Sequence, residues 1–115
     1  MLTILALMLA SPAVDMTAED ADSRCLAAFA LVAARKPDAG SADPNAAKAI
    51  EAGKIGAIYF TGKLLGRNPQ IDLEAAMRRV MPALTPVLTD ETRRCAVDLQ
   101  NAGLKLVSVG NALQK

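Results

Sequence analysis

The chain has two cysteines, and these are the residues best suited to chemistry. Cys25 and Cys95 do not form a C-x-x-C pair for redox exchange, and without a histidine they make a poor zinc site or nucleophile. In an exported protein an even number of cysteines indicates a structural disulfide instead. We therefore expect a Cys25–Cys95 disulfide that joins the first helix to the last.

The absence of histidine removes the commonest general base and metal ligand. No recognisable motif places two carboxylates together, and the sequence holds no Ser-His or Cys-His arrangement. We predict no catalytic, cofactor-binding or metal-binding residues; a small enzyme that uses only carboxylates, lysine or Tyr59 stays an alternative. The formal net charge of +1, from 13 basic and 12 acidic side chains, argues against a nucleic-acid partner.

Basic residues fall in several places where they could together bind an anionic partner. This possible basic patch consists of Lys63, Arg67, Arg78, Arg79, Arg93 and Arg94. A plainer interpretation is ion pairing on solvated helix faces, since acids precede arginines by four residues at Asp20–Arg24, Glu74–Arg78 and Asp90–Arg94. The sequence favours the ion pairs over the patch.

The stretch GAIYFTGKLLGR, residues 56–67, superficially resembles a phosphate-binding loop. Five residues rather than four separate Gly56 from Gly62, and Leu64 replaces the required hydroxyl after Lys63. Gly53 and Gly56 instead recur with alanines at helical spacing. We predict a core helix in which these glycines admit a neighbouring helix closely, since each costs about 0.5–1 kcal/mol relative to alanine.

Residues 1–13, MLTILALMLASPA, are typical of a secretory signal peptide. The apolar run is far shorter than the roughly 20 residues of a membrane span. No basic residue precedes it, so we expect a start codon further upstream; a buried N-terminal helix turn is the alternative. The predicted organisation is a signal peptide, 1–13, and one domain, 14–115, in the periplasm or outside the cell.

The rest of the chain predicts helices, because it is rich in alanine and leucine and only 3% aromatic. Thr17 starts a helix over 18–36 with an inward stripe, Asp43-Pro44 starts a helix that continues to about Leu65, and Asp72 caps a short helix closed by Pro82. The inward stripe of the first helix comprises Ala21, Cys25, Ala28, Phe29 and Val32.

The last helix has the cleanest apolar pattern in the sequence, beginning at Thr85-Pro86 or Thr89-Asp90. Its apolar residues recur at spacings of four and three: Cys95, Leu99, Ala102, Leu106, Val109 and Leu113. Ala96, Gly103 and Gly110 form a line of small residues beside them. This pattern predicts a surface for packing against other helices. We expect an all-α fold: a compact bundle of about four helices.

The order of Cys25, the segment IYFTGKLLGRNPQIDLEAAM and Cys95 resembles that of small exported two-cysteine helical bacterial proteins of unknown function. That resemblance implies no site residues. The chain is more loosely similar to periplasmic acid-stress chaperones of the HdeA kind, which are helical and held by one disulfide; it differs from them in cysteine spacing and lacks their tryptophan.

The sequence thus predicts a non-enzymatic, exported protein that binds another protein, or itself, through an apolar helix face. An acid-stress chaperone is the alternative, since twelve carboxylates lose their charge together in acid and leave a cationic chain. No cofactor and no stable membrane span after signal cleavage are expected.

Overall fold

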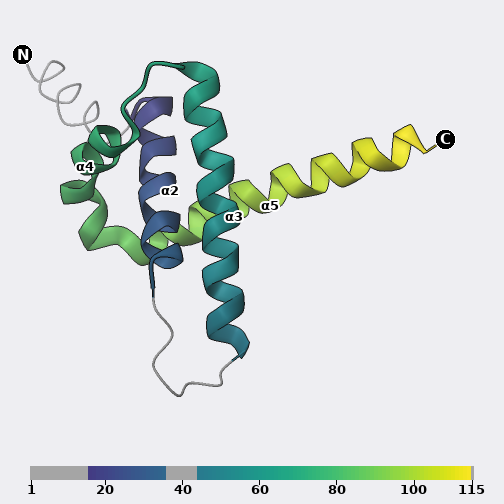
Figure 1. Cartoon of the computed structure of the whole chain (residues 1–115), viewed down its shortest axis with the longest axis horizontal. Helices are drawn as coiled ribbons and strands as arrows, with labels where there is room; N and C mark the ends of the chain where they lie inside the picture. Colours follow the sequence, from purple (N-terminus) through teal and green to yellow (C-terminus); the bar gives the residue numbers. More distant parts are fainter. Residues whose placement is uncertain (1–15, 36–43, 115) are drawn as a thin grey trace, which may run out of the picture.

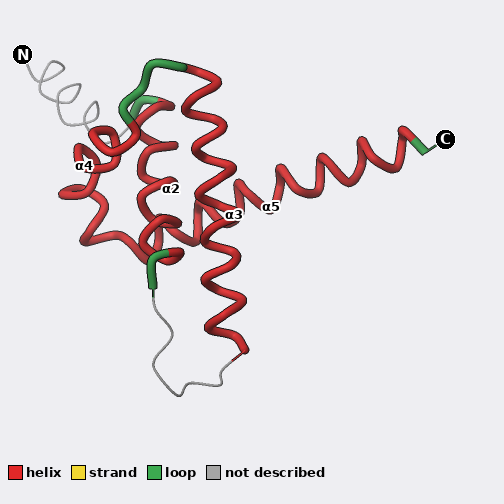
Figure 2. Tube along the Cα trace, in the orientation of Figure 1, coloured by secondary structure: helices red, strands yellow, loops and turns green. Residues whose placement is uncertain are grey.

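The computed structural model describes residues 16–35 and 44–114, and these residues form helices and turns without strands (Figures 1 and 2). The elements are α2 (Ala18–Ala33), α3 (Pro44–Arg67), α4 (Leu73–Leu84), the 3-10 turn η1 (Thr85–Val87) and α5 (Leu88–Leu113). The predicted all-α class is confirmed. The predicted signal peptide and the predicted N-cap Asp43 lie outside the described residues.

Two of the predicted helix starts are confirmed by their capping bonds. The Thr17 hydroxyl accepts a bond from the Asp20 N–H at 3.0 Å, and the Asp72 carboxylate accepts one from the Ala75 N–H at 3.1 Å. Each side chain satisfies a backbone donor that has no partner within the helix. α2 ends at Ala33, before the predicted end at Lys36.

Pro82 does not close α4, which continues to Leu84. A proline inside a helix removes one backbone hydrogen bond, and that loss usually ends the helix. Here Leu84 is completely buried with Val80 in the core, so burial outweighs the local cost. The Thr85 hydroxyl donates to the Met81 carbonyl at 2.8 Å, in addition to the bond that the Thr85 N–H makes to the same oxygen at the helix end.

The core surrounds α2, which is buried on most sides between the other helices. Phe29 of α2 stacks on Phe60 of α3, with ring centroids 5.8 Å apart. Leu64 lies in the same cluster, and a second cluster joins Ala27 of α2 to Val80 and Leu84. Cys25, Ala28 and Phe29 of the predicted inward stripe are buried, whereas Ala21 and Val32 are only half-buried. The stripe is also incomplete, because Asp22, Ser23, Leu26 and Ala27 are buried as well.

Gly53 and Gly56 of α3 lie where α2 crosses it, as the sequence predicted, whereas a Cβ atom on Gly62 or Gly66 of the same helix would meet nothing within 4 Å. A Cβ atom added to Gly56 would lie 2.5 Å from the Phe29 ring, and one on Gly53 would lie 2.9 Å from the Ala33 backbone nitrogen. Neither position has room for a side chain. The GAIYFTGKLLGR stretch is therefore helix packed on helix and not a phosphate-binding loop.

The predicted compact bundle of about four helices is wrong in its last member. Three helices, α2, α3 and α4, gather around the core, and α5 crosses them with its first half only (Figure 1). Cys95 is buried and Leu99 packs against the core. Beyond Leu99, α5 projects away from the other helices to the C-terminal end of the chain (Figure 1).

Candidate interaction surface

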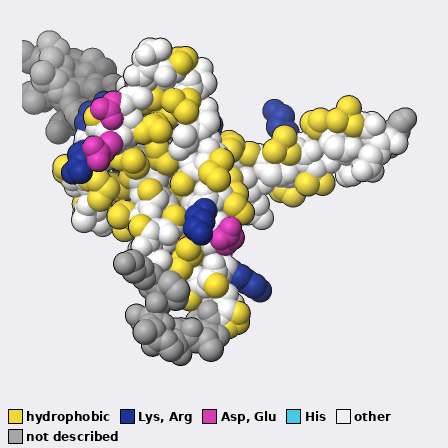
Figure 3. All heavy atoms as spheres, in the orientation of Figure 1, with side chains coloured by type: hydrophobic (Ala, Val, Ile, Leu, Met, Phe, Trp, Pro, Cys, Tyr) yellow, Lys and Arg dark blue, Asp and Glu magenta, His cyan; other side chains and the backbone are white. Residues whose placement is uncertain are grey.

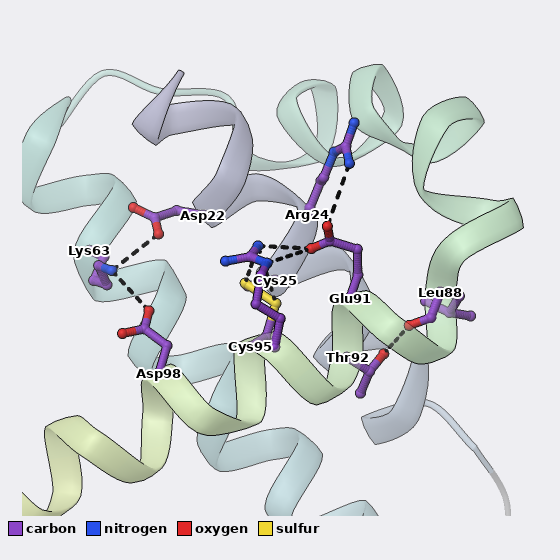
Figure 4. The surroundings of a disulfide bond; sticks show 10 residues. Asp22, Arg24, Cys25, Lys63, Leu88, Glu91, Thr92, Cys95 and Asp98 are labelled. Atoms are coloured by element: carbon purple, nitrogen blue, oxygen red, sulfur yellow. Dashed lines mark hydrogen bonds and ion pairs between the residues drawn. A yellow bond between two sulfur atoms is a disulfide. The ribbon is translucent and has the colours of Figure 1, made fainter. Parts of the chain in front are cut away.

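The disulfide fixes the point at which α5 crosses α2. Cys25 and Cys95 are bonded, with Cα atoms 5.4 Å apart, and both side chains are buried (Figure 4). The Arg94 guanidinium lies beside the bond, 3.5 Å from the Cys25 sulfur, and also donates to Glu91 at 2.8 Å. The predicted pairing of the two cysteines is confirmed.

A buried carboxylate beside the disulfide connects three helices. Asp22 of α2, whose side chain is 8% exposed, accepts from Arg67 at 2.8 Å and lies 3.2 Å from the Lys63 ammonium, both on α3. Lys63 also reaches Asp98 of α5 at 3.3 Å. Two cations compensate the loss of hydration at Asp22, which a buried charge requires. This network and the disulfide hold the base of α5 in place.

The two carboxylates change the acidity of Lys63. Burial by itself would lower its pKa, but the hydrogen bonds and charges of Asp22 and Asp98 outweigh burial and raise the pKa above the ordinary 10.5. Lys63 therefore stays an ammonium at neutral pH. It is a structural cation here and not a base poised near neutrality.

A hollow of about 440 Å³ lies over this network. It is lined by Ala18, Ala21, Asp22, Lys63, Arg67, Arg94, Val97, Asp98 and Asn101. Two carboxylates line the hollow beside its three cations, and Arg94 pairs with Glu91 next to it, so each cation already has a carboxylate partner. Within the described ranges no group of three or more acids and cysteines could hold a metal ion.

The six basic residues named from the sequence do not converge on one surface. Lys63, Arg67 and Arg94 line the hollow. The other three pair elsewhere: Arg79 with Asp20 at 2.6 Å, Arg78 with Glu74 at 3.5 Å and Arg93 with Asp90 at 3.6 Å. Every member of the predicted patch thus has a carboxylate partner.

One of the three predicted i,i+4 ion pairs is confirmed, and two are wrong. Glu74 and Arg78 pair along α4 as expected. Arg24 pairs with Glu91 of α5 at 3.7 Å, because α2 is enclosed by other helices and its charges meet partners across the interfaces. Arg94 pairs with Glu91 and not with Asp90.

The C-terminal half of α5 carries the longest run of exposed large apolar side chains in the described structure; Ile55 and Ile58 of α3 are exposed as well. We call residues 100–113 the α5 arm. Its large apolar side chains face solvent: Leu106 is 71% exposed, Val109 50% and Leu113 81%. Figure 3 shows hydrophobic side chains spread over this projecting segment. A monomeric protein rarely leaves a contiguous apolar surface open, and such a surface commonly marks an interaction site.

Three of the five large apolar side chains of the arm lie on one face. Ala102, Leu106, Val109 and Leu113 alternate at spacings of four and three, and we call them the seam. The seam continues the stripe that packs Cys95 and Leu99 against the core. Leu104 is 62% exposed and lies on nearly the opposite face of the helix, because it is two residues from Leu106. Val107, 61% exposed, also lies off the seam, so the opposite face of the arm mixes these two apolar side chains with the polar residues Gln100, Ser108 and Asn111.

Gly103 and Gly110 lie along one edge of the seam. A Cβ atom on either would meet nothing within 4 Å. The sequence predicted close packing at these positions as it did in α3, but in the described residues no helix covers them. The spacing of the residues identified this face of α5, but spacing does not show whether another helix of the described structure packs on it.

Comparisons with known proteins found no match: no protein-family model, no curated protein and no solved structure matches this chain. In the described ranges, no helix has the length and apolar character needed to cross a membrane.

Proposed function

We propose that this protein is a non-enzymatic, exported interaction module that binds a protein partner through the seam of the α5 arm. The observation that carries the proposal is the exposure of the seam in a helix whose preceding turns are fixed to the core. A disulfide between buried cysteines supports an oxidising compartment, where such bonds persist.

The contacts at the base of α5 support a binding role for the arm. The disulfide and the Asp22 network hold α5 at two neighbouring points on the core. An apolar helix that is fixed in orientation before binding loses less conformational entropy on binding than a free segment does. Amphipathic helices commonly bind helices or grooves through residues at this spacing.

Site-specific photo-crosslinking in the native cell tests the proposal. A photoreactive residue at position 106 lies on the seam, and the same residue at position 104 lies on the other face of the same exposed helix. We expect a discrete crosslinked protein from position 106, identified by mass spectrometry, and little or none from position 104. Equal labelling from both positions, or no discrete product from position 106, would contradict a seam-directed partner.

An acid-stress chaperone is the second candidate, and the placement of the charges favours it. The ion pairs between α2 and its neighbours all use carboxylates: Asp20 with Arg79, Asp22 with Lys63 and Arg67, and Glu91 with Arg24. Protonation in acid removes these pairs while the disulfide persists, so the helices can loosen and expose their apolar faces. Suppression of client aggregation in acid but not at neutral pH tests this candidate, and no protection at either pH refutes it.

A further inference from the structure

We infer that the partner of the seam is a second copy of this chain, bound as an antiparallel pair of α5 arms. The inference rests on the proposed function and names the partner class. Its two supports are the charge of the arm and the complementarity of the seam with itself in one register.

The charge of the arm suits a second copy better than an acidic or basic partner. Between residues 100 and 113 Lys105 is the one charged residue. An arm with so little charge offers no electrostatic selection for a charged peptide or an anionic surface. Two such arms also bring little like-charge repulsion to their own interface.

The seam has the spacing of a coiled coil, in which apolar residues alternate at three and four. Leu106 and Leu113 occupy one class of seam position, and Ala102 and Val109 occupy the other. In an antiparallel pair the two classes lie opposite each other. When Leu106 lies opposite Val109 of the other copy, Ala102 lies opposite Leu113, so the small residue of each copy faces the most exposed leucine.

The same register places the small residues and the charge favourably. Gly103 then lies beside Gly110 of the other copy, so the two backbones can approach closely along that edge. Lys105 lies beside Ala112 of the other copy and away from its own equivalent. The glycines, which meet nothing within 4 Å in one chain, are thus accommodated by the pairing.

The length of the interface between two arms indicates how tightly the dimer should bind. The arm is about 21 Å long at 1.5 Å per residue. An interface of that length falls at the small end of specific interfaces, where complexes are weak and reversible. We therefore expect a dimer that forms reversibly with concentration and does not need to form for the core to fold.

Sedimentation velocity of the oxidised chain across a wide concentration range tests the dimer. We expect a concentration-dependent monomer–dimer equilibrium in the wild type and in Leu104→Glu, and a monomer at every concentration in Leu106→Glu. Both leucines are exposed on the same arm and neither belongs to the core, so the pair isolates the face of the helix. Circular dichroism and thiol titration confirm that each variant is folded and oxidised. A wild type that is monomeric throughout, or a Leu106→Glu variant that still dimerises, overturns the inference.

Disulfide trapping tests the antiparallel register. The variants Ala102→Cys and Leu113→Cys are made separately, one of them isotopically labelled, then mixed and mildly oxidised. The expected product is the mixed dimer, identified by its intermediate mass. Preferential formation of the two homodimers indicates parallel arms and overturns the register.

The crosslinking experiment separates the two proposals. A product from position 106 with twice the mass of the chain supports self-association. A product with a different protein leaves the proposed function intact and overturns this inference. The absence of any product contradicts both.

Discussion

Gly53 and Gly56 of α3 and the two glycines of α5 share one sequence pattern and have opposite surroundings. In both helices glycine recurs beside large apolar residues at helical spacing. In α3 the Phe29 ring fills the space over Gly56, whereas Gly103 and Gly110 in α5 have nothing within 4 Å. The comparison teaches that periodicity identifies a surface built to be covered, but another part of the structure decides what covers it.

Core leucines and seam leucines differ in the same way. Leu64 is completely buried and Leu106 is 71% exposed. The packed region therefore carries the stability of the chain, and the α5 arm is free to carry binding.

Removal of the disulfide should destabilise the packed region most. Restraint of the unfolded chain across a loop of this length is worth roughly 4 kcal/mol, so we expect Cys25→Ala combined with Cys95→Ala to lower the free energy of unfolding by about 2–4 kcal/mol. Urea unfolding measures the change. Because both sulfurs are buried, a reductant should act slowly in native buffer and quickly in urea. Equal free energies of unfolding for the oxidised and reduced chains would show that the disulfide does not stabilise the fold.

A matched pair of leucine truncations tests the core against the arm. Leu64→Ala should cost about 3 kcal/mol, since it leaves a cavity in the core, whereas Leu106→Ala should change the free energy of unfolding by no more than about 0.5 kcal/mol. Chemical denaturation at low protein concentration, where association is negligible, gives both values. If Leu106→Ala is as costly as Leu64→Ala, the arm packs within its own chain.

A matched pair of glycine substitutions should differ in sign. Gly56→Ala should destabilise the chain by about 1–3 kcal/mol, because the added methyl group overlaps the Phe29 ring. Gly103→Ala should stabilise the monomer by up to about 1 kcal/mol, since alanine favours the helix and meets nothing there. Thermal unfolding in the Leu106→Glu background measures both without dimer formation. If both substitutions stabilise the chain, or both destabilise it, the two glycines do not differ in their surroundings.

The smallest effect concerns Lys63 and alkaline pH. Its pKa is raised in the folded chain, so its contribution to stability is full below the ordinary 10.5 and is lost as pH rises through the raised pKa. Urea midpoints should therefore fall as the pH rises above about 10. In Lys63→Arg the side chain at position 63 stays positively charged beside Asp22 and Asp98 at those pH values. The decline in the urea midpoint should therefore be weaker in this variant. An identical decline in the two proteins would show that other groups cause it.

Local signals in the sequence were sufficient for much of the fold. Thr17 and Asp72 predicted two helix starts because each cap is a contact within one turn. The cysteine pairing followed from a count of two. The prediction that α4 ends at Pro82 was wrong, because the burial of Leu84 in the core keeps the last turn of the helix intact. That burial is a tertiary contact, which local sequence does not reveal.

The helical class, the two caps at Thr17 and Asp72 and the seam of α5 follow from the amino-acid sequence alone, because they depend on residue type and on a spacing of three to four. The tertiary structure alone decided that α2 lies at the centre, that Asp22 is buried between two cations, and that α5 leaves the core after Leu99. The physical reason is that periodicity describes one helix at a time. Burial depends on which helices surround it, and the seam of α5 has the same pattern whether it is covered within the chain or by another copy.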